Sequence, residues 1–219
     1  MNTRIDIDAT PKLKAIKTDE MRSKMITPNL TTIHDNKVWT GYTSSAKLVD
    51  KDGDPAIEID KEDYNVVWLD GFEFTNGTIE FDVKGKSEPS QGSFIGVAFR
   101  VVDDAVYDSI YFRPFNFRAT DPDRKSHAVQ YQSFPDWDWY KLRTEKTGQY
   151  EKPIDPAPNG DMWFHAKIVI DERNIKVYVN NATEPALDVM ELSDRTGGSV
   201  GIYCFGYGVV ANLQVTPTP

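Results

Sequence analysis

Arginine and tyrosine side chains gather on one face of a predicted β-hairpin, in the segment from Phe94 to Asn116. Successive residues of a strand point to opposite faces, and one of the two faces formed here is apolar. The other face carries two arginines and two tyrosines: Arg100, Tyr107, Tyr111 and Arg113. Very small residues, Gly96 and Ala98, lie beneath them. The pattern favours a recessed binding surface; the alternative is a solvated face with chance ion pairs.

The register of this hairpin can also be predicted, with Val102 opposite Tyr107 across the turn at residues 103–106. The pairs that follow on the polar face are Arg100 with Ser109, Ala98 with Tyr111, and Gly96 with Arg113.

Two further groups of residues are expected beside this face. Gln130 and Gln132 alternate with apolar residues in a predicted strand. The segment from Phe134 to Asn159 contains four prolines and cannot be regular throughout. It also brings three aromatic residues close together: Trp137, Trp139 and Tyr140. Long loops in compact domains are either functional or disordered, and tryptophans argue against disorder, so these rings are binding candidates.

A pair of carboxylates, Glu80 and Asp82, lies two residues apart in the strand-like run Thr78–Lys84. Apolar residues alternate with them, so both carboxylates project from the same face of the strand. We expect that face to adjoin the polar face of the hairpin. The chemical interpretation is an acid pair that acts on a substrate, and the alternative is simple pairing with arginines across the sheet.

The elements that position these residues are short β-type runs separated by turns, which fill the chain from Val38 onward. About a dozen strands and no convincing helix are expected, which favours an all-β sandwich of two sheets over residues 38–219. Residues 1–37 are polar and predict an arm that packs on the domain or is partly mobile, with a short helix over Lys12–Met25. The run Asp50–Asp54 has the spacing of a calcium loop but lacks its final Glu, so a hairpin turn on Asp-Gly is predicted.

Composition narrows the function classes. The 219-residue chain has a formal net charge of −9 and no basic stripe, which argues against nucleic acid or an anionic membrane as partner. Uncharged polar substrates such as sugars remain as candidate ligands.

The single cysteine, Cys204, excludes an intramolecular disulfide. No signal-like or membrane-length apolar run is present, so a cytoplasmic location is expected, with a mature secreted form as the alternative. No metal-ligand spacing occurs, so no cofactor is predicted, and the sequence does not show whether a divalent metal takes part.

Several strand motifs resemble the bacterial 3-keto-disaccharide hydrolase family of the concanavalin A-like lectin/glucanase superfamily. The motifs are GTIEFDV, SFIGVAFRVVDDAVYDSIYFRPFNF, AVQYQS, WFHAKIVI, IKVYVNNA and GGSVGIYCFGYGVVANLQV. The resemblance covers roughly residues 40–216. It implies a jelly-roll sandwich of two antiparallel sheets, one of them concave and carrying a sugar site. It implies a glycoside-acting protein, and the same sandwich also serves as a non-catalytic lectin-like or laminin G-like module.

The resemblance also suggests roles for the candidate residues. In the glucanases of this superfamily the catalytic acids follow Glu-x-Asp-x-Glu on one strand; Glu80 and Asp82 match the first two positions and Lys84 occupies the third. For a 3-keto sugar, elimination needs a base, here sought at Asp103, Asp104 or Asp108, and a cation such as Arg100 or Arg113. The predicted catalytic residues are therefore Glu80, Asp82, Arg100 and Arg113. The predicted sugar-binding residues are Tyr107, Tyr111, Gln130, Gln132, Trp137, Trp139 and Tyr140.

Overall fold

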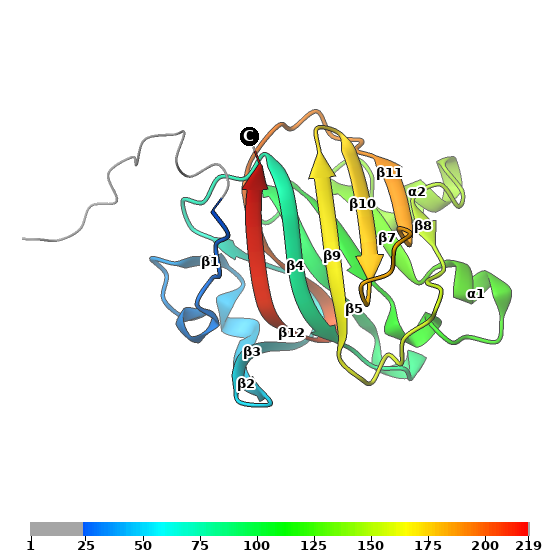
Figure 1. Ribbon diagram of the computed structural model, residues 1–219, viewed down its shortest axis with the longest axis horizontal. Helices are drawn as coiled ribbons and strands as arrows, with labels where there is room; N and C mark the ends of the chain where they lie inside the picture. The colour runs from blue at the N-terminus through cyan, green and yellow to red at the C-terminus, as the bar shows by residue number, and fades with distance from the viewer. Residues whose placement is uncertain (1–23, 219) are drawn as a thin grey trace, which may run out of the picture.

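The computed structural model describes residues 24–218, and this part of the chain is mostly β-structure (Figure 1). The strands are β1 (Trp39–Gly41), β2 (Ala46–Lys51), β3 (Asp54–Leu69), β4 (Asn76–Lys84), β5 (Ser93–Val101), β6 (Tyr107–Phe112), β7 (Val129–Phe134), β8 (Glu151–Lys152), β9 (Phe164–Asp171), β10 (Asn174–Val179), β11 (Leu187–Met190) and β12 (Ser199–Thr218). The α-helices are α1 (Pro122–Ser126) and α2 (Trp139–Glu145), and four single 3₁₀ turns are η1 (Leu30–Thr32), η2 (Thr43–Ser45), η3 (Pro89–Gln91) and η4 (Pro114–Asn116).

The strands form two layers that share β12. The front layer in Figure 1 has the order β11-β10-β9-β4 and ends with the C-terminal half of β12; the N-terminal half of β12 begins the back layer, which continues β5-β6-β7-β8. β12 belongs to both layers because residues 199–206 pair with β5 and residues 209–218 pair with β4. β3 pairs with β12 across both halves. All these pairings are antiparallel, as a jelly-roll sandwich requires.

The change of layer in β12 occurs at a glycine. The register between β3 and β12 shifts between Phe205 and Gly206, and Gly206 has a φ of 76°. A Cβ atom at this position would collide with the backbone oxygen of Gly92. Only glycine combines a left-handed backbone with this close approach, so Gly206 lets one strand serve both layers.

The core between the layers follows from the alternation of each strand. In β4 the residues Ile79, Phe81 and Val83 are fully buried, and the polar residues between them are not. Phe112 of β6 contacts rings of the facing layer, with ring centroids 6.4 Å from Phe81 and 5.2 Å from Phe164. Each such buried side chain contributes about 1.5–3 kcal/mol through apolar burial, so these contacts hold the layers together.

The predicted all-β, two-sheet architecture is confirmed. β3 and β12 each unite two runs that the sequence pattern separates. The hairpin turn at Asp52 and Gly53 is also confirmed, with φ values of 54° and 99°. Helices α1 and α2 lie where loops were expected.

Part of the predicted N-terminal arm packs on the sandwich. Leu30 and Ile33 are buried in the core, and Ile26 pairs with Val215 of β12. The apolar core therefore recruits residues upstream of Val38. The helix predicted over Lys12–Met25 lies outside the described residues, apart from its last two positions, which are not helical.

The predicted register of the β5–β6 hairpin is wrong by two residues, since Ser109 pairs with Ala98 and not with Arg100, and Tyr111 pairs with Gly96 and not with Ala98. The face assignment still holds up to Ala98. Arg100 departs from it because its φ of 49° inserts an extra residue into β5, opposite the shift in β12 between Ser199 and Gly201. Its side chain leaves the polar face and is buried against Glu191.

Candidate functional site

The outer face of the back layer, turned away from the core, carries most of the predicted binding residues; we call it the pocket face. Tyr111 pairs with Gly96 on one side and with Gln130 on the other, and Gly96 pairs in turn with Tyr203 of β12. Because Gly96 has no side chain, the rings of Tyr111 and Tyr203 meet above it with centroids 5.3 Å apart. The predicted floor of small residues thus exists, and aromatic rings cover it.

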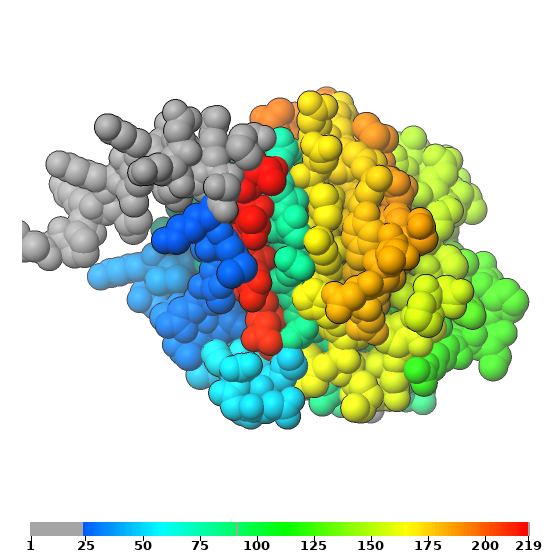
Figure 2. Space-filling model, in the orientation of Figure 1, coloured from blue at the N-terminus to red at the C-terminus, as the bar shows by residue number. Residues whose placement is uncertain are grey.

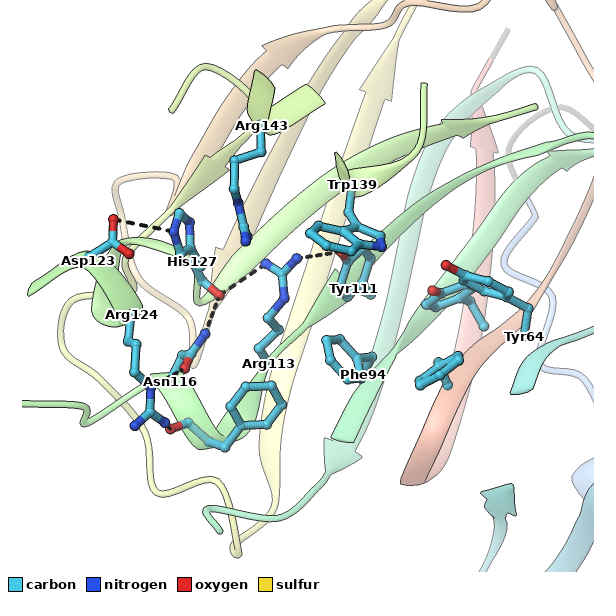
Figure 3. A pocket seen from close by; sticks show the side chains of 13 residues that line it. Tyr64, Phe94, Tyr111, Arg113, Asn116, Asp123, Arg124, His127, Trp139 and Arg143 are labelled. Atoms are coloured by element: carbon cyan, nitrogen blue, oxygen red, sulfur yellow. Dashed lines mark hydrogen bonds and ion pairs between the residues drawn. The ribbon is translucent and has the colours of Figure 1, made fainter. Parts of the chain in front are cut away.

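A cavity of about 450 Å³ opens on the pocket face (Figure 3). One end is aromatic and is lined by Tyr64, Phe94, Tyr111, Phe115, Trp139, Tyr203 and Phe205. The rings brace one another, with centroid distances of 5.2 Å for Tyr64 and Phe205 and 5.6 Å for Phe94 and Phe205. Packed rings of this kind form a rigid wall on which the apolar side of a ligand can stack.

The other end of the cavity is polar and is lined by Arg113, Asn116, Asp123, Arg124, His127 and Arg143. Arg113 lies at the junction of the two ends, between Tyr111 and His127 in Figure 3. It donates from Nη2 to the Tyr111 hydroxyl at 2.7 Å and to Gln130 Oε1, and Tyr111 donates to the same Gln130 oxygen at 2.8 Å. This closed set of hydrogen bonds fixes the Arg113 guanidinium in one orientation.

A buried carboxylate, Glu151 of β8, lies behind the polar end. It accepts from Arg143 Nη2 at 2.9 Å, contacts His127 Nδ1 at 2.8 Å, and accepts a longer bond from Arg113 Nη1 at 3.4 Å. Burial acts to raise the pKa of Glu151, but the Arg143 guanidinium, with Arg113 and His127, outweighs it and holds the pKa below its usual value. Glu151 is therefore an ionised anchor at neutral pH and a poor proton donor.

The phenols of the floor stay protonated. Burial raises the pKa of Tyr111 to about 12, against the opposing effect of Arg113, and burial also raises the pKa of Tyr203 well above its usual value. Both hydroxyls are thus neutral hydrogen-bonding groups and not bases at physiological pH.

Helix α2 places Trp139 and Arg143 one turn apart on the same side. Asp138 caps the helix by accepting from Lys141 N at 2.8 Å, and Arg143 lies over the Trp139 ring, 5.3 Å from its centroid. Helix α1 and the residue after it supply Asp123, Arg124 and His127. Neither helix was predicted from the sequence, so Asp123, Arg124, His127 and Arg143 were missed. The sequence signals for the two helices were the aspartates at their N-cap positions, Asp121 and Asp138.

Other lining residues could have been found from strand parity. Phe94 shares the parity of Gly96 and Ala98, and Phe205 shares that of Tyr203. Tyr64 follows because it pairs with Phe205 across β3 and β12.

Two of the predicted binding residues, Tyr111 and Trp139, and one of the predicted catalytic residues, Arg113, line the cavity. Gln130 lies beneath it, bonded to two of them. Tyr107 and Gln132 share the pocket face but are buried away from the cavity. Trp137 packs against the core below Lys141 and Lys146, and Tyr140 is 62% exposed beside Trp139.

Glu80 and Asp82 lie on the outer face of the front layer, away from the cavity, so their expected position beside the hairpin is wrong. Asp82 pairs with Lys51, accepts from Asn212 at 2.8 Å and contacts His165 Nδ1 at 3.0 Å. Glu80 is 3.6 Å from His165. The alternation of side chains predicts a shared face only for strands that are neighbours in one layer. β4 and β5 are not neighbours, because β12 lies between them and bends from one layer to the other. The contacts of Glu80 and Asp82 agree with the alternative interpretation, in which the two carboxylates pair with basic side chains across the sheet. The partners are a lysine and a histidine in place of the expected arginines.

The remaining predicted acid and cation positions also lie away from the cavity. Arg100 and Asp108 belong to a buried cluster at one end of the sandwich, where Asp108 accepts from Tyr131 at 2.6 Å, from Ser193 at 2.8 Å and from Arg195 at 2.9 Å. Asp103 and Asp104 are exposed in the hairpin turn.

Residues 24–218 contain neither a metal-type cluster of side chains nor a membrane-spanning helix. No cluster of three His, Cys, Asp or Glu side chains in this part of the chain has the arrangement of a metal site. None of its helices is long and apolar enough to cross a membrane.

Comparison with known proteins identifies the fold. No family model and no curated protein sequence matches the chain. Among solved structures, the carbohydrate-binding module CBM66 from Bacillus subtilis has a TM-score of 0.56 at 15% identity and covers 83% of this chain and 97% of its own. The Bacillus licheniformis β-glucanase has a TM-score of 0.57 at 10% identity, with 89% and 98% covered. The lumenal domain of VIP36, in its form bound to Ca²⁺ and Man3GlcNAc, also has a TM-score of 0.57 at 10% identity, with 89% and 88% covered.

These likenesses show that the chain has the jelly-roll fold of these proteins. Membership of the 3-keto-disaccharide hydrolase family stays a prediction.

Proposed function

We propose that the protein binds a mono- or oligosaccharide in the cavity of the pocket face. The observation that carries this proposal is the combination of seven aromatic side chains at one end with fixed planar hydrogen-bonding groups at the other, around about 450 Å³. Sugar rings have apolar C–H faces that stack on aromatic side chains, and hydroxyls that arginine and amide groups recognise. The volume lies within the usual range for small-ligand sites, about 300–1,000 Å³.

The similar structures support a carbohydrate ligand, since one is a carbohydrate-binding module, one is a glucanase and one contains an oligosaccharide. The carboxylates near the cavity favour a protein that binds the sugar without ordinary glycoside hydrolysis. Such hydrolysis uses two carboxyl groups, one of them protonated as general acid. Of the two carboxylates at the polar end, Glu151 is buried and held ionised, and Asp123 has a side chain that is 85% exposed.

The binding proposal is tested by calorimetry with a panel of mono- and oligosaccharides. Trp139→Ala removes the ring that forms one wall, and Tyr140→Ala removes the neighbouring, outward-facing ring as a matched control. We expect Trp139→Ala to weaken binding about tenfold or more, because truncating an anchoring aromatic side chain costs more than about 1 kcal/mol. Tyr140→Ala should bind as wild type does. Failure of every sugar to bind, with the chain folded, would sink the proposal.

A second candidate function is elimination of a 3-keto glycoside, which the position of His127 favours. The imidazole lies in the cavity wall between Glu151 at 2.8 Å and Asp123 at 3.6 Å, beside two arginines. His127 would take the proton from the carbon next to the ketone, and an arginine would stabilise the enolate oxygen. The adjacent glycosidic C–O bond then breaks, and the departing oxygen takes up a proton.

Incubation with a 3-keto-glucoside, with and without divalent metal, tests this candidate. We expect release of the aglycone by the wild type, loss of at least 100-fold in rate for His127→Gln, in line with the roughly 10²–10⁴-fold worth of acid–base catalysis, and little change for the exposed-face variant His165→Gln. Binding of the substrate without turnover would leave the protein a carbohydrate-binding module only.

A further inference from the structure

The polar end of the cavity carries more positive than negative charge, in a chain whose formal net charge is −9. Three arginines line it or its mouth, and the carboxylates around them are Glu151 and Asp123. Arg113 and Arg143 share one carboxylate, that of Glu151. An excess of about one positive charge therefore faces a ligand in this cavity.

Two of the arginines have donors left for a ligand. Arg143 uses Nε and Nη2 on Glu151, and its side chain is 33% exposed, with the tip directed toward Arg113 in Figure 3. Arg124 is exposed and donates only to neutral oxygens, at 3.4 Å to Asn116 Oδ1 and at 3.3 Å to the backbone of Phe115. Within residues 24–218 no carboxylate lies at ion-pair distance from Arg124.

The aromatic and cationic ends adjoin each other. Trp139 and Arg143 lie on one side of α2, and Arg113 lies between the Tyr111 ring and His127 (Figure 3). A sugar ring stacked at the aromatic end would therefore direct a substituent toward the guanidinium groups. A planar carboxylate accepts two parallel hydrogen bonds from a guanidinium, which makes arginine its preferred partner.

On the basis of the proposed sugar-binding function, we propose that the ligand is an acidic sugar, a hexuronate residue whose carboxylate is held at the arginine-lined polar end, where Arg124 is the cation without a carboxylate partner within residues 24–218. One negative charge matches the local excess. A phosphorylated sugar carries up to two charges and would meet Glu151 and Asp123, so a single carboxylate is the better match.

Calorimetry with paired ligands tests this inference: glucuronate against glucose, galacturonate against galactose, and oligosaccharides of each kind. The methyl ester of each uronate keeps the shape and removes the charge. We expect at least tenfold tighter binding of one uronate than of its parent hexose and its ester, with the difference shrinking as salt rises from 0.05 to 0.5 M. Glucose 6-sulfate and glucose 6-phosphate separate carboxylate recognition from binding of any anion, and tighter binding of either would contradict the proposal.

Arg124→Gln should reduce the preference for the uronate, measured as the ratio of its affinity to that of the parent hexose, severalfold. Arg118→Gln, which removes an exposed arginine outside the cavity, is the matched control. Equal affinity for the uronate and its ester would refute the acidic ligand while the proposed sugar binding stood. Absence of binding by neutral and acidic sugars alike would refute both.

Discussion

Arg113 holds the floor of the cavity together at four points. Its guanidinium donates to the Tyr111 hydroxyl, to Gln130 Oε1, to the backbone oxygen of His127 at 3.2 Å and to Glu151 at 3.4 Å. The Arg113 side chain is only 5% exposed. If Arg113 were removed, the acceptors that it binds would therefore have no access to water. The same residue is thus required for the shape of the floor and for its charge.

We predict that Arg113→Met lowers the free energy of unfolding by roughly 1–3 kcal/mol, the cost of leaving buried polar groups unpaired. The loss stays in this range because Arg143 still neutralises Glu151 and His127 still contacts it. Urea denaturation measures it, and Arg118→Met, at an exposed arginine, is the control. Equal stability of the two variants would show that the hydrogen-bond set contributes nothing.

Glu191 gives the second prediction at this scale. Burial, with the nearby Asp108 carboxylate, raises the pKa of Glu191 to about 7 although Arg100 opposes the shift. Between its unfolded pKa near 4.3 and about 7, the folded state therefore binds more protons than the unfolded state. The free energy of unfolding must then fall as pH rises through this window, and level off above it.

The comparison that isolates Glu191 is the slope of unfolding free energy against pH, in the wild type and in Glu191→Gln. We expect the wild type to lose more stability between pH 5 and 7.5 than the variant does, whatever the variant's absolute stability. Parallel pH profiles would contradict the raised pKa.

At the scale of elements, the sequence predicts the part of the site that follows from the alternation of side chains along each strand. Tyr111, Gln130 and the small residue Gly96 lie together because pairing between neighbouring strands obeys alternation. Arg100 escapes this rule through one left-handed residue, and no pattern in the sequence marks such an insertion. Glu80 escapes it because its strand belongs to the other layer.

The helical walls could not be predicted from periodicity. α1 has five residues and α2 has seven, too few for an amphipathic repeat to stand out. They form because an aspartate caps each N-terminus, a local signal that is also common in turns. Arg143, which supplies part of the cationic end, was therefore missed, and so was His127 beside it.

The cap of α2 leads to a prediction about binding. Asp138→Ala removes the side-chain acceptor for Lys141 N and should lower stability by about 0.5–2 kcal/mol. Because Trp139 and Arg143 are held by this helix, sugar affinity should also fall severalfold. Asp136→Ala, an exposed aspartate outside the helix, is the control. Unchanged affinity in Asp138→Ala would mean that the wall keeps its position without the cap.

At the scale of the molecule, β12 makes the two layers one unit. Its two halves pair with β5 and β4, and Phe112 packs against rings of the facing layer. Neither layer can lose its part of β12 without disturbing the other. The cavity, which lies on the back layer alone, therefore depends on the core that joins both.

We predict that the layers unfold in one transition. Tryptophan fluorescence and far-UV circular dichroism should give the same urea midpoint, although the chain is longer than the roughly 150 residues below which two-state unfolding is usual. Phe112→Ala should shift both midpoints together, by about 3–5 kcal/mol of unfolding free energy, because it opens a cavity between the layers. Two separated transitions, or a shift in one probe only, would show that the layers are independent. In that case β12 would be a tether between two units, and binding on the pocket face would survive loss of the front layer.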